Sequence, residues 1–192
     1  AEPDWQKRGI EVHSTTPSYI IYLFGLGTGD RPAIGQDLIE ALWRDNKDPV
    51  LSPSETFLPF SQKFGLTKSE FLKALPAHTS PKIRVMYPEG FIAKAFLDQL
   101  LLSAKSVGTE IEFTAVSPTA FMASFDDPRA KEKFDYVLSA YAASERYPAV
   151  QLRYLTKNLE KTTIDLKKAE SPDFTGDRTP IFKDYERWLL TA

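Results

Sequence analysis

Apolar and polar residues alternate along three segments in the middle of the chain. In residues 82–87 the apolar side chains Ile83, Val85 and Tyr87 recur at every second position, which is the period of a half-buried strand. Residues 109–116 repeat this alternation, and residues 134–141 form a nearly continuous apolar run. We therefore predict a strand in each of these segments.

Two helical segments separate the predicted strands. Residues 91–107 form a long apolar stretch that ends at Gly108, a residue that tolerates the positive φ of a helix terminus. Pro118 opens a second helical stretch, which is interrupted near Asp127 and Pro128. A strand–helix–strand–helix–strand order predicts parallel strands joined by right-handed crossovers.

The flanking segments supply further elements. Residues 19–24 are β-branched or aromatic almost throughout and apolar on both faces, which predicts a strand at the centre of the sheet. Residues 33–44 and 66–75 have helical patterns, and the second begins with Thr67 and Glu70 at the spacing of a capping box. Towards the carboxyl terminus we expect a helix near residues 149–159, an irregular polar segment over residues 161–176, and a final helix that starts at residues 179–180.

These elements predict the α/β class, with a mostly parallel central sheet and helices on both of its faces. We expect one domain over residues 1–192. Because parallel sheets bind ligands beyond the carboxyl ends of their strands, functional residues are expected after Tyr87, Val116 and Tyr141.

Composition narrows the possible function classes. The formal net charge of −2, with acids and bases intermixed, argues against a nucleic-acid or anionic-membrane partner. The absence of cysteine excludes disulfides and thiol chemistry. No apolar run approaches the roughly 20 residues that span a bilayer. The chain begins with Ala1 rather than Met, so we expect it to be a piece of a longer protein.

Motifs of enzymes and metal sites are not found. Three glycines in residues 25–29 lie between a predicted strand and a helix, but Asp30 replaces the last glycine of a dinucleotide-binding loop and would repel a pyrophosphate. His13 and His78 are the only histidines, and neither has further ligands at metal spacing. No nucleophile motif is present. We therefore expect a protein that is not an enzyme and that holds no cofactor or metal.

Residues 139–148, at the end of the most apolar predicted strand, have the composition of a binding site. They include two tyrosines, hydroxyl groups and the opposed charges of Glu145 and Arg146. Rigid aromatic surface with a few polar groups is typical of small-molecule clefts. The alternative is a strand-to-helix loop in which Tyr147 packs on the body of the domain.

Several segments in succession carry a family resemblance. Residues 107–113 match a helix that ends in glycine before an alternating strand, and residues 133–138 match a strand of the Asp-Phe-Asp type. Residues 140–148 keep the aromatic, the alanine and the proline of a Gly-Trp-x-Ala-Asp-Tyr-x-Asp-Pro pattern, with Ser144 and Tyr147 in place of its aspartates. In this order the segments resemble bacterial extracellular solute-binding proteins of the dipeptide, oligopeptide and nickel class, the binding components of ABC importers.

The resemblance implies that the chain is the second lobe of a two-lobe periplasmic binding protein whose other lobe is absent. Such a protein captures a solute, here expected to be peptide-like, and presents it to a membrane permease without catalysing a reaction. We expect a monomer with a periplasmic or extracytoplasmic location. The alternative is the ligand-sensing domain of a transcriptional regulator with the same fold. The ligand contacts that the resemblance implies are Tyr141, Ser144, Glu145 and Arg146, with Tyr22 and Phe24 at the wall of the site.

One departure from the family pattern bears on the ligand. In peptide-binding relatives the acid at the position of Ser144 is the natural partner of a ligand's free α-amine, because a carboxylate compensates a buried ammonium. A hydroxyl brings no charge, so a buried ammonium there would be poorly compensated. We therefore expect a ligand that is not held by a free amino terminus.

Overall fold

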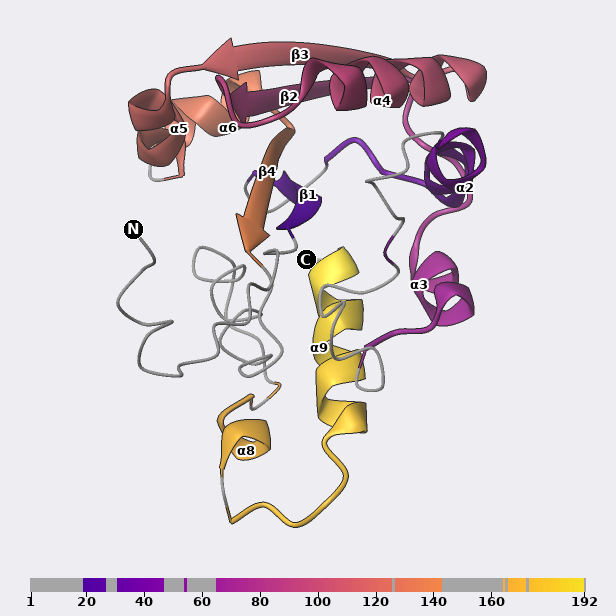
Figure 1. Ribbon diagram of the computed structural model, residues 1–192, viewed down its shortest axis with the longest axis vertical. Helices are drawn as coiled ribbons and strands as arrows, with labels where there is room; N and C mark the ends of the chain where they lie inside the picture. The colour runs from indigo at the N-terminus through magenta and orange to yellow at the C-terminus, as the bar shows by residue number, and fades with distance from the viewer. Residues whose placement is uncertain are drawn as a thin grey trace, which may run out of the picture.

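The computed structural model describes residues 19–26, 31–46, 54, 65–125, 127–142, 164, 166–171 and 173–191. In this part of the chain the strands are β1 (Tyr19–Gly25), β2 (Lys82–Pro88), β3 (Glu110–Val116) and β4 (Tyr136–Ala142). The helices are α2 (Gln36–Asp45), α3 (Lys68–Ala74), α4 (Lys94–Ser106), α5 (Pro118–Ser124), α6 (Pro128–Lys133), α8 (Leu166–Glu170) and α9 (Thr179–Thr191). Figure 1 shows their arrangement. The helix expected near residues 149–159 lies outside the described residues.

The four described strands form one sheet in the order β1-β4-β2-β3. β2 pairs with both β3 and β4 in parallel, which confirms the predicted strand–helix–strand–helix–strand unit. β1 pairs with β4 in the antiparallel sense, so the sheet is mixed. The predicted α/β class is therefore confirmed, with three parallel strands and one antiparallel strand in the described sheet.

The prediction of a central position for β1 is wrong. Among the described strands β1 pairs with β4 alone and lies at one end of the sheet. Its residues are nevertheless apolar on both faces because both faces are covered. Ile21 and Leu23 pack against one core cluster, and Phe24 packs against another. The apolar pattern of β1 reports burial between two layers, not the place of the strand in the sheet.

Helices cover both faces of the sheet, as predicted. On one face α2 and α4 pack against the strands, and this cluster consists of Leu38, Ile83, Val85, Ile92, Leu97, Leu100, Ala104, Ile111 and Leu138. On the other face Phe121 of α5 packs with Leu26, Met86 and Val137. Alternate residues of β2 therefore enter different cores, with Val85 on one side and Met86 on the other. Each fully buried side chain of this size contributes roughly 1.5–3 kcal/mol through removal of apolar area from water.

The ends of α4 depend on two glycines with positive φ. Gly108, after the helix, has φ of 78°, as the sequence predicts. Gly90 also has φ of 78°, and it turns the chain between β2 and the helix. The helix therefore begins at Lys94 with Ala93 as its N-cap, not at Phe91. As a result Phe91 lies in the turn, where it is 70% exposed.

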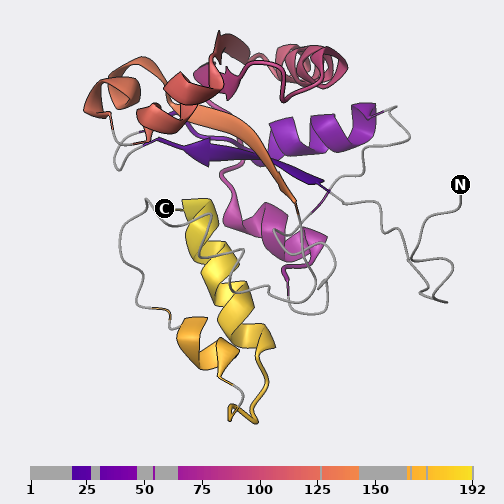
Figure 2. The ribbon, with the colours of Figure 1, turned by 60° about the vertical axis from the view of Figure 1, so that its left-hand side comes forward.

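The two carboxy-terminal helices form an apolar cluster of their own, which lies below the sheet in both ribbon views (Figures 1 and 2). Its buried residues are Leu166, Ala169, Phe182 and Tyr185. The final helix predicted to start at residues 179–180 is confirmed, and Ile181, Trp188 and Leu189 pack around the cluster. The expectation of an irregular segment over residues 161–176 is wrong where α8 forms, because Leu166 and Ala169 find an apolar partner in α9.

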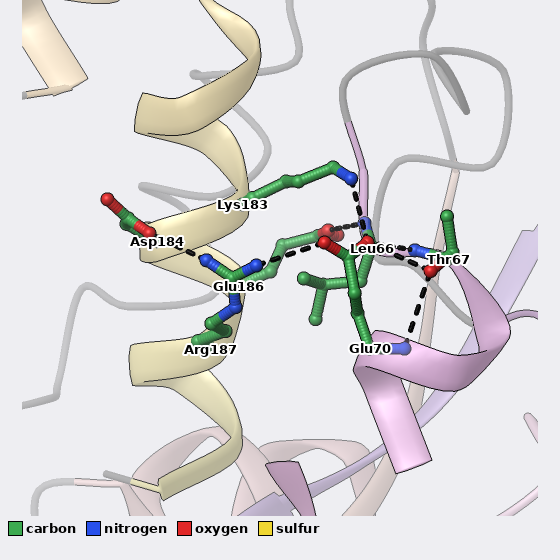
Figure 3. Close-up of polar contacts among 7 residues, drawn as sticks. All are labelled: Leu66, Thr67, Glu70, Lys183, Asp184, Glu186 and Arg187. Atoms are coloured by element: carbon green, nitrogen blue, oxygen red, sulfur yellow. Dashed lines mark hydrogen bonds and ion pairs between the residues drawn. The ribbon is translucent and has the colours of Figure 1, made fainter. Parts of the chain in front are cut away.

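A polar cluster joins α9 to α3 (Figure 3). Glu70 completes the predicted capping box by accepting a hydrogen bond from Thr67 N at 2.9 Å. The same carboxylate pairs with Lys183 Nζ at 2.7 Å and with Arg187 Nη2 at 3.1 Å. Next to it, the buried carboxylate of Glu186 accepts a hydrogen bond from Leu66 N at 2.8 Å. The described helices α3 and α9 are thus held together largely by charge-assisted hydrogen bonds.

Replacing Val85 by aspartate should unfold the chain. Val85 is fully buried on the face of the sheet that α2 and α4 cover, and an unpaired charge there costs about 4 kcal/mol or more. That is a large part of the total stability of a domain. Circular dichroism should show loss of the cooperative thermal transition. Ala115→Asp is the control, since it adds the same charge at an exposed position of β3. A Val85→Asp melt that matches the parent would contradict the burial of β2.

Glu70→Gln should lower the free energy of unfolding by about 1 kcal/mol, because it weakens the capping box and both ion pairs. The Lys183 hydrogen bond, followed by the bonds from Thr67, lowers the pKa of Glu70 from 4.5 to about 2. Since the pKa is lower in the folded chain, the stabilisation is complete above pH 4.5 and is lost as the pH falls towards 2.

Urea unfolding at a series of pH values measures this difference. The gap between the parent and Glu70→Gln should close as the pH falls through that window. Glu40→Gln is the matched control, because Glu40 is exposed on α2 and forms no ion pair with any described residue. A gap that is the same at neutral and acidic pH would contradict the role of the Glu70 charge.

Candidate functional site

The carboxyl ends of the three parallel strands lead into segments of different kinds. β3 leads directly into α5, whose N-cap Ser117 accepts a hydrogen bond from Ala120 N at 3.2 Å. β2 leads into an ordered turn that contains Glu89 and Phe91. β4 leads into residues 143–150, which lie outside the described residues. The end of β3 is therefore occupied by a helix cap, and the ends of β2 and β4 are the candidates for ligand contact.

The start of β4 is fixed against β2 by one carboxylate. Asp135 Oδ2 accepts hydrogen bonds from Arg84 N at 2.7 Å and Arg84 Nε at 3.2 Å, and Asp135 Oδ1 accepts one from Arg84 Nη2 at 2.6 Å. In return Asp135 N donates to Arg84 O at 2.9 Å. Arg84 Nη1 also donates to Glu132 O at 2.8 Å. The guanidinium thus binds the last turn before β4 at several points.

Opposing effects act on the pKa of Asp135. Burial, the largest of them, raises the pKa, because the carboxylate is only 8% exposed. The side-chain and backbone hydrogen bonds from Arg84, together with its charge, lower the pKa and outweigh burial. The net pKa is lowered, so the ionised carboxylate that binds Arg84 is the stable form in the fold.

Beyond this contact β4 leaves β2 and continues with β1. β2 and β4 are in register at only two positions, Val85 with Tyr136 and Met86 with Val137. β1 pairs with β4 along its whole length, from Gly25 opposite Tyr136 to Tyr19 opposite Ala142. The two strands therefore extend together beyond the end of β2, as Figure 1 shows. The carboxyl end of β4 projects past the parallel part of the sheet.

The described site residues predicted from sequence share one face of this two-stranded extension. Tyr22 is half-buried and opposite Ser139, while Phe24 is opposite Val137. Tyr141 is opposite Ile20, and the alternation of the strand assigns its position to the same face. Phe24 packs in the α5-side core, so its contact with a ligand stays a prediction.

The remaining predicted contacts, Ser144, Glu145 and Arg146, lie outside the described residues. No group of three or more histidine, aspartate or glutamate side chains in the described part of the chain could hold a metal ion. His78 is an exposed loop residue, with its Nδ1 3.4 Å from Asp37 Oδ2. His13 is not among the described residues.

Glu89 and Phe91 are site candidates that the sequence did not reveal. Phe91 was predicted to lie in a helix, where an apolar residue is expected to be part of the buried face. The signal that could have found them is Gly90, which can form a turn after the strand and so delay the start of the helix beyond Phe91. Both residues come directly after the end of β2, the strand that lies between β4 and β3.

No protein-family model matches the chain, and no curated protein does. Its fold is similar to that of solved solute-binding proteins. The peptide-binding protein of a peptide ABC transporter matches with a TM-score of 0.55 and 13% identity over 90% of this chain and 94% of that chain. The pheromone receptor PrgZ, solved for its mode of peptide binding, matches with a TM-score of 0.53 and 12% identity over 92% of this chain and 41% of its own.

The periplasmic murein tripeptide binding protein MppA of Escherichia coli, in its unliganded open form, matches with a TM-score of 0.52 and 13% identity over 97% of this chain and 42% of its own. The chain thus spans about two fifths of the length of PrgZ and MppA. At these identities the likeness concerns the fold. The described helices include none that is long and apolar enough to cross a membrane. The solved structures confirm that the fold resembles a lobe of the peptide-binding proteins of ABC importers.

The hydrogen bonds between Asp135 and Arg84, which fix the start of β4 against β2, give a testable prediction. Asp135→Asn should lower the free energy of unfolding by about 2 kcal/mol, because it removes the charge of a buried, multiply bonded pair. The pKa of Asp135 is lower than its ordinary value, so its contribution is complete near neutral pH and is lost as the pH falls through the lowered pKa.

Chemical denaturation near neutral pH and in acid measures this effect. Asp98→Asn is the matched control, because Asp98 pairs with Lys94 at 2.6 Å on the exposed face of α4 and its loss should change stability little. Equal effects of the two substitutions would contradict the role of Asp135.

Proposed function

We propose that the chain is one lobe of a two-lobe binding protein that captures a peptide-like solute for an ABC importer. The observation that carries the proposal is the β1–β4 extension. It brings the positions of Tyr22 and Tyr141 to one face at the carboxyl end of a parallel sheet, the place where such sheets bind ligands. The fold shared with solved peptide-binding proteins supports the same function.

In this function the chain binds a solute and does not transform it. The other lobe would cover the ligand from the opposite side, and closure of the two lobes would present it to a membrane permease. The complete protein would work as a monomer in the periplasm or in another extracytoplasmic compartment. A single lobe offers only part of the surface that buries a ligand, so the chain alone should bind weakly.

Nuclear magnetic resonance on the isotope-labelled chain tests the proposal, because chemical shifts detect weak binding. Titration with the tripeptide Ala-Phe-Ala should shift backbone amides at the ends of β2 and β4 and leave those of α8 and α9 unchanged. Maltose is the non-peptide control. The absence of any shift with the peptide would contradict the proposed function. Sub-micromolar affinity for the chain alone would contradict the proposal that one lobe supplies only part of the binding surface.

A further prediction of the proposed function concerns the amino terminus of the ligand. Because Ser144 brings no charge, acetyl-Ala-Phe-Ala should bind as well as the free tripeptide. Comparing the two titrations measures the difference. Preference for the free peptide that disappears in Glu145→Gln would contradict this expectation and would assign the ammonium to Glu145, the adjacent residue.

A further inference from the structure

The turn between β2 and α4 exposes an aromatic side chain at the edge where ligands are expected. Phe91 is 70% exposed, more than Leu102 at 65% or Met122 at 63%. The next residue, Ile92, is 8% exposed and packs in the core beneath α4. The exposure of Phe91 therefore belongs to an ordered position, since its neighbour is fixed in the core.

Hydrogen bonds at the base of the turn fix its shape. Glu89 N donates to Val116 O at 2.8 Å, which joins the turn to the end of β3. Phe91 N donates to Pro88 O at 3.3 Å and closes the turn around Gly90. Apart from Gly90 and its two chain neighbours, no described residue has a heavy atom within 4 Å of the position that a Cβ of Gly90 would take. These hydrogen bonds thus fix the backbone that carries Glu89 and Phe91.

The carboxylate of Glu89 is exposed and makes no ion pair with a described residue. The acids at the opposite end of the β2–β3 pair differ in this respect, since Lys82 lies 3.3 Å from Glu112 and 3.7 Å from Glu110. An exposed apolar ring and an exposed carboxylate two residues apart in one turn, the carboxylate without an ion pair among the described residues, can together bind a group that is apolar and cationic at once. A permanent contact with the other lobe explains the exposed Glu89 less well than a ligand does, because the cores of protein interfaces are depleted of charged residues.

We propose that Glu89 and Phe91 form a ligand contact that selects a solute with an apolar side chain next to a cationic group. The proposal rests on the proposed function and adds the class of its ligand. The apolar side chain stacks on Phe91, and the ammonium or guanidinium group beside it pairs with Glu89. The cation is a side chain of the ligand, which agrees with a ligand that is not held by its free amino terminus.

Three blocked dipeptides test the proposal on the labelled chain. Acetyl-Phe-Lys-amide carries both groups, acetyl-Phe-norleucine-amide lacks the cation, and acetyl-Gly-Lys-amide lacks the ring. The first should bind about fivefold more tightly than either of the others. Glu89→Gln should remove the preference for lysine over norleucine, and Phe91→Ser should remove the preference for phenylalanine over glycine.

Two control variants make the same chemical changes elsewhere. Glu40→Gln removes an exposed carboxylate from α2, and Leu102→Ser removes an exposed apolar side chain from α4. Both should bind the three peptides like the parent chain. All four variants alter exposed residues, so their amide spectra outside the altered site should match that of the parent.

Each remaining outcome has one interpretation. Shifts at the end of β4 that are the same in the parent, Glu89→Gln and Phe91→Ser would overturn the inference and leave the proposed function standing. Equal affinity of the three peptides for the parent would overturn it as well. If none of the peptides shifts any amide, the inference and the proposed function both fail.

Discussion

The contact between Asp135 and Arg84 is the constraint on which the candidate site depends. It joins the beginning of β4 to β2 through three hydrogen bonds to one carboxylate. After that point the two strands keep register at only two positions, and β4 continues with β1. A carboxylate that is 8% exposed is costly to leave unpaired, which favours a single alignment of β4 on β2. The same contact therefore decides where the extension carrying Tyr22 and Tyr141 leaves the sheet.

The parallel unit could be predicted from sequence because local patterns and topology agree there. The alternation of residues 82–87, the glycine at position 108 and the order of the elements predict parallel strands joined by helices, and β2 pairs in parallel with both β3 and β4. The place of β1 could not be predicted in the same way. An apolar pattern on both faces indicates two covering layers, and an outer strand between two helix layers meets that condition as well as a central one. α8 was missed because its two buried residues gain a partner only when α9 packs against them.

The candidate site was predictable in part, and the reason is geometric. The rule that ligands bind beyond the ends of parallel strands directs attention to three loops, but it does not say which of them is open. The structure separates them, since Ser117 caps α5 at the end of β3 and the turn after β2 exposes Phe91. Sequence periodicity assigned Phe91 to a helix, because the left-handed conformation of Gly90 that delays the helix is not part of an apolar pattern.

The sheet layer and the α8–α9 pair are each held together by apolar packing, but polar contacts join one to the other. The sheet is held by apolar clusters on both faces, and α8 packs on α9 through a third cluster. Among the described residues, α9 is joined to α3, which has no buried residue, by Glu70 with its two cationic partners and by the buried Glu186, which accepts a hydrogen bond from Leu66 N. The Glu70 bonds lie at a half-exposed surface and can be exchanged for water at low cost, whereas breaking the buried Glu186 bond or opening an apolar core is costly. In the proposed two-lobe protein, this division would keep the strands of the lobe rigid while the two lobes move relative to each other. The β1–β4 edge is held by the two-sided apolar core, and polar bonds of Glu70 and Glu186 connect that layer to the carboxy-terminal helices.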